Sequence, residues 1–319
     1  MNKENKIISI VVPVYNEEEV IEIFIEELFK VLQKIKYSYE VIIVDDGSHD
    51  KTTEKIKNLR KRYSAIKFLS FSRNFGHQCA LFAGIKHASG SAIVMMDGDL
   101  QHPPSLIINL LEEWKSGAKV VQTIRRDVNI PILKKITSKL FYFLLNIFSE
   151  TKFIASSPDF RLIDREVANE LLKFKENDVF LRGLIPWLGY KSTYVYFEPQ
   201  GRFAGKSKYS IFKMIKFSVS GITSFSTLPL KIAIFVGIII AILSFALGIQ
   251  SLYIRIFTDQ AVQGWTSLMI GVFFIGGLLM IFLGVLGEYI GNIYLQAKDR
   301  PRYIIVEHLG FEKNEEINE

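Results

Sequence analysis

The chain has 319 residues, a formal net charge of +6 and a hydrophobic fraction of 49%. A basic balance is typical of proteins that bind nucleic acid or an anionic membrane surface, and no recognised nucleic-acid-binding module is present. We therefore expect membrane lipids, and no nucleic acid, among its partners. The single cysteine, Cys79, cannot form an intrachain disulfide, which suits a reducing compartment.

Strand and helix patterns alternate along the first hundred residues. Apolar, mostly β-branched runs predict buried strands at 7–14, 40–44, 66–71 and 92–96. Helical periodicity predicts helices between these strands, at 20–35, 51–63 and 77–88. Asn16 is the expected N-cap of the first helix, with acidic residues in its first turn. This alternation indicates an α/β fold with a doubly wound, mostly parallel sheet.

Carboxylates follow two of the predicted strands. Asp45 and Asp46 end the second strand, and Asp97 and Asp99 follow the fourth. Ligands of such sheets bind beyond the carboxyl ends of the strands, where Tyr15 also falls. A capped turn before the helix at 51–63 is the alternative for the first pair, although one carboxylate can cap the helix while the other binds a ligand.

The segment 96–101, Met-Asp-Gly-Asp-Leu-Gln, predicts a divalent metal site. Carboxylate oxygens suit Mg²⁺ or Mn²⁺, and such ions commonly lie between a few carboxylates and a substrate diphosphate. Asp97 and Asp99 would supply the carboxylates, and Gln101 a carbonyl oxygen. The alternative is an ordinary turn, which Asp-Gly-Asp also describes.

Two long apolar runs lie in the last third of the chain, at 232–252 and 268–290. Each is long enough to span the hydrocarbon core of a bilayer, which takes about 20 helical residues. Buried core helices are the alternative, but a soluble fold of this size needs no such pair. Basic residues crowd the outer flanks, whereas the connecting segment has only Arg255 and Asp259 as charged residues. The positive-inside rule therefore predicts two spans with both termini in the cytoplasm.

The segments beside the spans are amphipathic. Lysines alternate with apolar residues over 210–225, which predicts a helix lying in the membrane interface. The segment 130–148 is either a second interfacial helix or a helix packed on the α/β domain. We accordingly divide the chain into a cytoplasmic α/β domain (1–205), a juxtamembrane segment (206–230), a transmembrane hairpin (231–292) and a cytoplasmic tail (293–319), with both charged ends frayed.

Four motifs together carry a family resemblance. They are Val-Val-Pro-Val-Tyr-Asn-Glu at 11–17, Val-Asp-Asp-Gly-Ser at 44–48, Asp-Gly-Asp with its following glutamine at 97–101, and Asp-Phe-Arg-Leu at 159–162. The set resembles the inverting family 2 glycosyltransferases of the GT-A fold. Within that family the chain is most similar to the polyprenyl-phosphate glycosyltransferases, which include bactoprenol glucosyltransferases and, more distantly, dolichol-phosphate mannose synthases. The resemblance covers nearly the whole chain, including the two apolar runs.

The resemblance implies a nucleotide-sugar site in the first half of the chain. Pro13, Tyr15 and Glu17 match the first nucleotide-contacting segment of the family, with Tyr15 near the base. Asp45 matches the aspartate that hydrogen-bonds the base, and Asp46 lies beside it.

The resemblance also assigns the metal ligands. Asp97 matches the first carboxylate of the metal motif, near the ribose and diphosphate. Asp99 matches the main metal ligand and a catalytic residue, and Gln101 completes the set. Gly98 stands where the mannose synthases usually carry alanine, a difference that we expect to be neutral for the chemistry.

Basic residues and one further aspartate complete the implied site. Arg125 aligns with an arginine near the donor phosphates. Arg202 and Lys208 match a catalytic basic loop that closes over the donor diphosphate or the lipid phosphate. A juxtamembrane polybasic patch is the alternative for this loop, and it suits Lys206, Lys213 and Lys216. Asp159 occupies the position of the family's candidate base, where it would orient the acceptor or remove a residual proton.

The implied activity is the metal-dependent transfer of a sugar from a UDP-sugar to undecaprenyl or another polyprenyl phosphate. It would take place at the cytoplasmic face of the cell membrane, invert the anomeric centre and serve cell-envelope glycan modification. Glucose is the first choice of sugar, and the alternatives are N-acetylglucosamine, galactose, an amino-arabinose, or mannose from GDP-mannose.

Two other classes of protein are less well supported. A processive polysaccharide synthase would need more spans and a Gln-x-x-Arg-Trp motif, and the chain has neither. A non-catalytic membrane scaffold would not need the complete carboxylate set. The glycines of the second apolar run let helices pack closely, which would serve either the hairpin itself or a homo-oligomer, with a tetramer as one arrangement.

Overall fold

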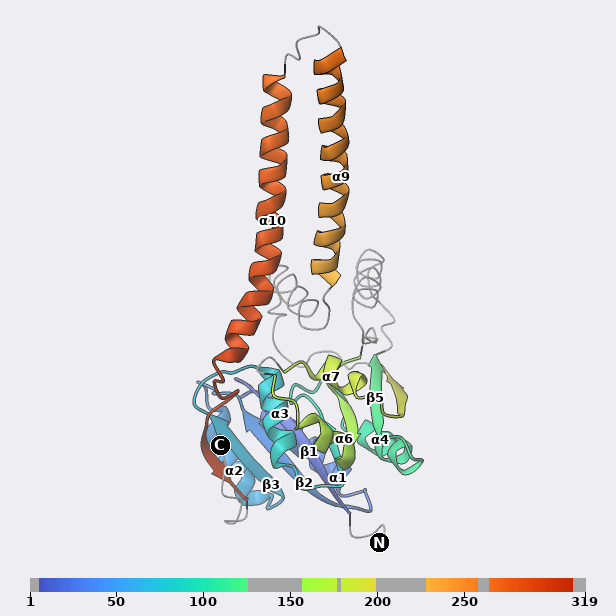
Figure 1. Ribbon diagram of the computed structural model, residues 1–319. Helices are drawn as coiled ribbons and strands as arrows, with labels where there is room; N and C mark the ends of the chain where they lie inside the picture. Colours follow the sequence, from blue (N-terminus) through green and yellow to red (C-terminus); the bar gives the residue numbers. More distant parts are fainter. Residues whose placement is uncertain (1–5, 126–156, 177–178, 199–227, 258–263, 312–319) are drawn as a thin grey trace. The chain divides into compact units, whose positions relative to one another are not determined.

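The computed structural model describes residues 6–125, 157–176, 179–198, 228–257 and 264–311. These residues belong to two compact units (Figure 1). The first contains the described residues up to 198 together with those from 300 onward, and the second contains the two long helices between them. The predicted interfacial segments at 130–148 and 210–225 lie outside the described residues.

An eight-stranded sheet, in the order β7-β5-β6-β4-β1-β2-β3-β8, forms the centre of the first unit. Its strands are β1 (Ile7–Val14), β2 (Ser38–Asp45), β3 (Ile66–Phe71), β4 (Ala92–Met95), β5 (Val120–Arg125), β6 (Arg161–Asp164), β7 (Ser192–Phe197) and β8 (Ile305–Leu309). β1 is parallel to β2 and β4, β2 to β3, and β5 to β7. Only β6 and β8 run antiparallel to their neighbours in the described sheet. The predicted α/β fold with a mostly parallel sheet is therefore confirmed.

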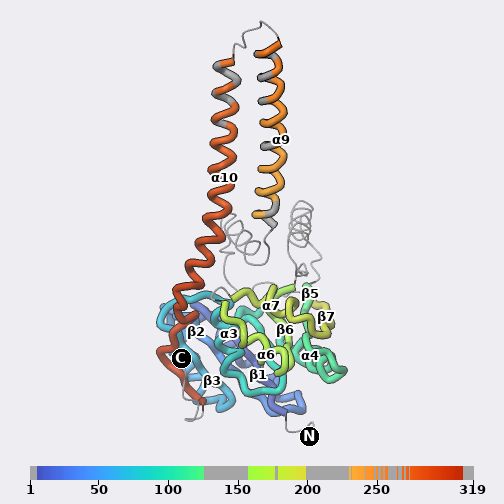
Figure 2. Tube along the Cα trace, viewed as in Figure 1, coloured from blue at the N-terminus to red at the C-terminus, as the bar shows by residue number. Residues whose placement is uncertain are grey.

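Six helices of the described residues pack around this sheet (Figures 1 and 2). They are α1 (Ile21–Leu32), α2 (Thr52–Arg62), α3 (His77–His87), α4 (Leu106–Lys115), α6 (Arg165–Leu171) and α7 (Leu181–Trp187). α1 forms because apolar side chains recur every three or four residues, and this stripe is fully buried against the sheet from Ile21 to Leu32. Burying each such side chain contributes about 1.5–3 kcal/mol.

The predicted N-cap of α1 is wrong. Asn16 has a φ of 53°, and the helix begins only at Ile21, after Val20 at the cap position. Asn16 instead joins two loops, because its backbone N–H donates to Ser48 Oγ and its Oδ1 accepts from the backbone N–H of His49. Asparagine tolerates this left-handed conformation better than most residues.

Close approach of α3 to the sheet depends on one glycine. A Cβ at Gly84 would lie 2.2 Å from Cγ1 of Val11 on β1. Any larger residue would therefore push the helix away from the strand. Because α3 begins at His77, this packing also fixes the position of that helix's first turn.

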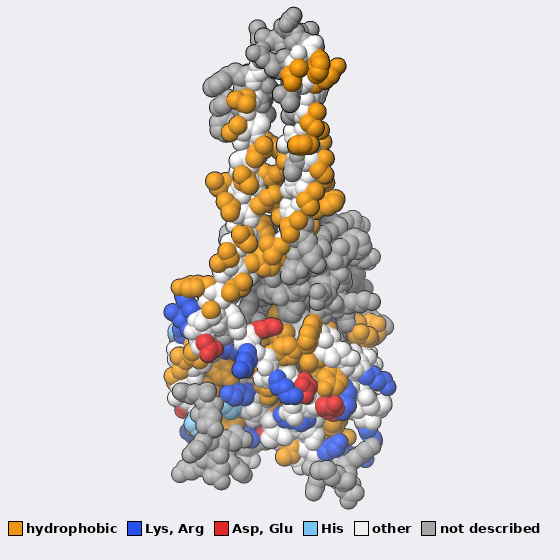
Figure 3. Space-filling model, in the orientation of Figure 1, with side chains coloured by type: hydrophobic (Ala, Val, Ile, Leu, Met, Phe, Trp, Pro, Cys, Tyr) orange, Lys and Arg blue, Asp and Glu red, His pale blue; other side chains and the backbone are white. Residues whose placement is uncertain are grey.

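The second unit consists of two long helices, α9 (Leu228–Phe257) and α10 (Trp265–Ala297). In the described part of the chain one stretch, Phe274–Ala297, is long and apolar enough to cross a membrane, with a mean hydropathy of 1.9. α9 contains a shorter apolar stretch, Ile232–Leu247, so the predicted second span stays a prediction. Figure 3 shows hydrophobic side chains along both helices, and Phe245 and Met280 are 73% and 71% exposed.

The segment after α10 differs from the expected frayed tail. Ile305–Leu309 forms β8, which pairs with β3 at the edge of the sheet. Ahead of it, Tyr303 stacks on Phe71 with ring centroids 5.0 Å apart, and the carbonyl of Ile304 accepts from the backbone N–H of Ser72. The sequence does not reveal this strand because its charged neighbours mask a short apolar alternation. The boundary of the α/β domain thus extends to residues beyond the long helices.

We expect Tyr303→Ala to destabilise the protein by about 2 kcal/mol, somewhat less than the roughly 3–5 kcal/mol for a fully buried aromatic residue. The physical reason is the loss of the stacked contact that holds the segment before β8 on β3. Val306→Ala is the control, since Val306 is 63% exposed in the same strand, and we expect a change within about 0.5 kcal/mol. Urea unfolding followed by tryptophan fluorescence measures both. Equal losses would mean that this contact does not fasten the strand.

Candidate active site

The parallel register brings several loops to one edge of the sheet. Val14 lies opposite Asp45, and Val11 lies opposite Met95, so β1, β2 and β4 end near one another. The backbone N–H of Asp46 donates to the carbonyl of Val14, which continues the pairing beyond the strands. The predicted site residues after these strands therefore lie along the same edge, as expected.

His77, at the start of α3, lies between two carboxylates of this edge. Its Nε2 is 3.2 Å from Oδ1 of Asp97 and 3.4 Å from Oδ2 of Asp159. Burial opposes the charged imidazole, but the hydrogen bond to Asp159 and the charge of Asp97 together raise the pKa of His77. One imidazole thus links the loop after β4 with the loop before β6.

Asp159 is the most heavily bonded carboxylate of the site. Nε and Nη2 of Arg182 donate to its two oxygens, each at 2.9 Å, and Nε2 of Gln78 donates to Oδ2 at 2.9 Å. Only 2% of its side chain is exposed, as is the case for Arg161, whose Nη2 lies 3.7 Å away. Burial opposes ionisation, but the charge of Arg182 and these hydrogen bonds hold the pKa of Asp159 well below its usual range. The residue is a buried carboxylate whose negative charge is stabilised by these neighbours.

The predicted metal ligands have one feature that suits a cation. Burial raises the pKa of Asp97, and its Oδ1 has no hydrogen-bond donor, although His77 is within ion-pair distance. Within the ranges that the structure describes, no three His, Cys, Asp or Glu side chains gather closely enough to hold a metal ion. Mg²⁺ needs no such cage, because it is usually bound by one or two carboxylates, waters and substrate phosphates. Asp97 and Asp99 fit this requirement.

Gln101 is placed to hold Asp99. Its backbone N–H donates to Oδ1 of Asp99 at 3.1 Å, and its Nε2 donates to Oδ2 at 2.6 Å. Between them Leu100 has a φ of 59°, a costly conformation for a leucine that the surrounding loop must maintain. A Cβ at Gly98 would lie 3.1 Å from Cγ1 of Val14, so an alanine there would require that side chain to shift slightly. In this geometry the amide nitrogen of Gln101, rather than its carbonyl oxygen, faces the carboxylate.

Asp45 and Asp46 fasten loops. Oδ1 of Asp45 accepts from the backbone N–H and the hydroxyl of Ser48, and Oδ2 accepts from the hydroxyl of Thr53 at 2.6 Å. Asp46 accepts from the backbone N–H groups of Phe75 and Gly76, just before α3, and burial raises its pKa. Both residues are buried, and these hydrogen bonds show that they hold the loops, whereas their contacts with a nucleotide stay predictions.

The remaining predicted residues are distributed more widely. Pro13 is buried in β1, while Tyr15 is 38% exposed at the rim of the edge. The backbone N–H of Glu17 donates to the hydroxyl of Thr52, which joins the loops after β1 and β2. Arg125 is exposed at the end of β5, and two antiparallel pairings through β6 bring that end to the same edge as β4. Two further predicted residues, at positions 202 and 208, lie outside the described residues.

Sequence reasoning missed His77, Gln78 and Arg182 as members of this cluster. The first two follow β3, so the rule that chemistry gathers at strand ends applies to them as it does to the aspartates. Arg182 lies on the short helix α7, and no motif marks it. Its neighbour in the cluster, Arg161, belongs to the quoted Asp-Phe-Arg-Leu motif but received no role.

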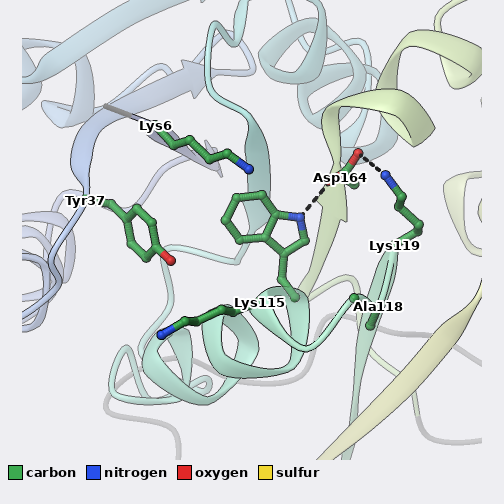
Figure 4. A pocket seen from close by; sticks show the side chains of 8 residues that line it. Lys6, Tyr37, Lys115, Ala118, Lys119 and Asp164 are labelled. Atoms are coloured by element: carbon green, nitrogen blue, oxygen red, sulfur yellow. Dashed lines mark hydrogen bonds and ion pairs between the residues drawn. The ribbon is translucent and has the colours of Figure 1, made fainter. Parts of the chain in front are cut away.

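A cavity of about 140 Å³ lies elsewhere in the first unit, beside the beginnings of β1, β2 and β5 (Figure 4). Its polar groups already bind one another. Nε1 of Trp114 donates to Asp164 at 2.7 Å, Lys119 pairs with the same carboxylate at 3.1 Å, and Lys6 lies over the indole ring. We therefore assign this cavity a packing role. It lies away from the edge of the sheet that carries Asp45, Asp46, Asp97, Asp99 and Asp159, which we call the carboxylate edge.

A family model and the similar proteins both point to the glycosyltransferases. The family model described as glycosyl transferase family 2 matches residues 9–172. An uncharacterized glycosyltransferase of Bacillus subtilis strain 168 is 43% identical over 305 residues, covering 95% of this chain and 94% of the relative. A bactoprenol glucosyl transferase of Shigella phage SfII is 40% identical over 299 residues, covering 93% of this chain and 97% of the relative.

Solved structures show a weaker likeness. A mannosyltransferase from Pyrobaculum calidifontis, in complex with GDP-Man and Mn2+, is 18% identical with a TM-score of 0.49. The match covers 69% of this chain and 62% of that chain. A likeness at this level does not show which sugar donor or which metal this chain binds.

We expect Gly47→Ala to be costly at this edge. Gly47 has a φ of 72°, and a Cβ there would lie 2.5 Å from the backbone carbon of Arg73. The left-handed strain costs about 1–2 kcal/mol, and the backbone clash adds about 1–3 kcal/mol. Gly117→Ala is the matched control, because its φ is 102° but nothing lies within 4 Å of the added atom. Thermal unfolding compares the two variants, and similar costs would contradict close contact between the loops after β2 and β3.

Proposed function

Because the chain belongs to glycosyl transferase family 2, we propose that it transfers a sugar from a UDP-sugar to a polyprenyl phosphate. Two findings support this. The similarity to a bactoprenol glucosyl transferase extends over 93% of the chain, which includes both the α/β unit and the long apolar helices. Glucose is the first choice of sugar for the same reason. The second finding, which supports the chemistry, is the edge of the sheet where Asp97 and Asp99 follow β4 and Asp159 precedes the antiparallel strand β6.

The donor diphosphate would bind at this edge. Asp97 and Asp99 would hold Mg²⁺ or Mn²⁺, which when bound neutralises the charge that develops on the leaving nucleoside diphosphate. Gln101 fixes the position of Asp99 through two hydrogen bonds. Arg125, Arg202 and Lys208 are proposed to add positive charge around the phosphates.

The acceptor needs little activation. A lipid phosphate is ionised near neutral pH, so its oxygen can displace the diphosphate directly and invert the anomeric centre. Asp159 is poorly suited to act as a strong base, because its pKa is held low and both oxygens accept hydrogen bonds. We therefore assign it the orienting role rather than proton removal.

Membrane attachment would bring the enzyme to its acceptor. The exposed apolar stretch Phe274–Ala297 supports at least one span. We propose that the stretch in α9 forms a second span and that the chain has both termini in the cytoplasm, since basic residues flank the pair. A homo-oligomer, held through the glycines of α10, stays a prediction.

The direct test is sugar transfer by purified protein to undecaprenyl phosphate from a panel of labelled UDP-sugars and GDP-mannose. We expect transfer from UDP-glucose, its loss in EDTA and its return with Mg²⁺ or Mn²⁺. Asp99→Asn should lower the rate at least about a hundredfold, because the negative charge of the main metal ligand is lost. Glu112→Gln on the exposed face of α4 is the control and should leave it unchanged. Full activity in excess chelator would contradict metal dependence, and transfer from another sugar alone would replace glucose.

Topology can be tested with single cysteines in a Cys79→Ser background. We expect a cysteine at Gln260, between the two apolar runs, to react with an impermeant maleimide added to intact cells. A cysteine at Lys313 should react only after the cells are opened, because basic flanks stay in the cytoplasm. Labelling of Lys313 from outside, or of both positions, would contradict the two-span arrangement.

A further inference from the structure

Arg182 stands between a buried anion and solvent. Its side chain is 39% exposed, whereas the Asp159 carboxylate that it binds is 2% exposed. The two hydrogen bonds use Nε and Nη2 and are both 2.9 Å long. This geometry fixes the plane of the guanidinium, while part of the Arg182 side chain is exposed at the carboxylate edge.

Gln78 fixes the same arrangement from α3. Its Nε2 donates to Asp159, and its Oε1 accepts from the backbone N–H of Leu181 at 3.0 Å. Leu181 is the first residue of α7 and immediately precedes Arg182. One amide side chain therefore ties the buried carboxylate to the backbone beside the arginine.

A second guanidinium group, that of Arg161, lies beside Asp159. Arg161 is fully buried 3.7 Å from the carboxylate, and burial lowers its pKa to about 10, so it stays protonated at neutral pH. Its Nε and Nη1 have no hydrogen-bond partner in the described part of the chain. Arg161 and Arg182 thus both face Asp159, and His77 lies between this carboxylate and Asp97. Positive groups are therefore gathered around Asp159, and Arg182 is the one of the two guanidinium groups that is partly exposed, where it can attract an anion.

We propose that Arg182 binds a phosphate group of a substrate, and that Asp159 and Gln78 are positioning residues that act through it. The inference rests on the proposed function, because both of its substrates carry phosphate: the donor as a diphosphate and the acceptor as a lipid phosphomonoester. A planar guanidinium matches phosphate oxygens in a way that lysine cannot. The role of Asp159 is then to hold Arg182 rather than to accept a proton.

The first experiment compares Arg182→Gln and Arg182→Lys with Arg62→Gln in steady-state transfer. Arg62 is the matched control, since it lies 65% exposed on α2 and pairs only loosely with Glu26 at 3.7 Å. We expect Arg182→Gln to lower kcat/KM by roughly tenfold to a hundredfold, as for loss of a charge-assisted hydrogen bond. Arg182→Lys should recover part of this loss, and the control should equal the wild type.

The source of the phosphate follows from which substrate is affected. A raised KM for a short-chain polyprenyl phosphate assigns Arg182 to the acceptor, and a raised KM for the UDP-sugar assigns it to the donor. Calorimetric binding of UDP and of the short-chain polyprenyl phosphate gives the same answer without turnover. If Arg182→Gln weakens neither ligand by more than threefold, the inference is overturned. A wild type that binds but transfers no sugar would instead overturn the proposed function.

A double-mutant cycle tests the positioning role. If Asp159 acts through Arg182, Asp159→Asn should cost much less in the Arg182→Gln background than in the wild type. An independent base would give losses that multiply, which would overturn the positioning role of Asp159. Gln78→Leu provides a second variant that leaves both charges in place, and we expect it to raise the same KM as Arg182→Gln while changing kcat less. Thermal unfolding of each variant checks that the fold is intact.

Discussion

In the central ladder Val14 faces Asp45 and Val11 faces Met95, so the chain leaves β1, β2 and β4 at a common edge. This parallel register is the constraint on which the site depends, because functional side chains can come together only in the loops at the ends of the strands. A slip of one residue would turn every strand side chain to the opposite face. The fully buried residues of β1 and β2 make such a slip very costly, and the edge is correspondingly well defined.

Loops at this edge are held mainly by carboxylates that accept backbone or hydroxyl hydrogen bonds. Asp45 holds the turn after β2, Asp46 holds the approach to α3, and Asp159 holds the start of α7 through Gln78. Removing one partner of a buried ion pair costs about 3–5 kcal/mol, since it leaves an uncompensated charge. The aspartates of these motifs can therefore be needed as much to hold the conformation of the loops as to contact a ligand.

The first four strands, the three helices between them and the common edge could be predicted from the sequence, because hydrophobic periodicity and the residues that follow a strand are local signals. The pairing of Asp159 with Arg182 could not, since 23 residues separate them and only folding brings α7 beside the loop before β6. Asn16 shows a different limit: its side chain satisfies the loop after β2, a tertiary contact that overrides its preference for a helix cap. β8 is not predictable from the sequence for two reasons: its charged neighbours mask a short apolar alternation, and its partner strand lies more than 200 residues earlier.

The antiparallel edge strand β8 also changes how the two units are connected. A sheet edge with unpaired N–H and C=O groups is prone to pair with another chain, and β8 covers the edge of β3. An ion pair of 2.6 Å between Lys57 and Glu307 and the stacking of Tyr303 on Phe71 reinforce it. The chain therefore enters the apolar helices from the α/β unit and returns to that unit's sheet after them. Attachment at both ends means that the long helices are an insertion in the domain rather than an appended tail.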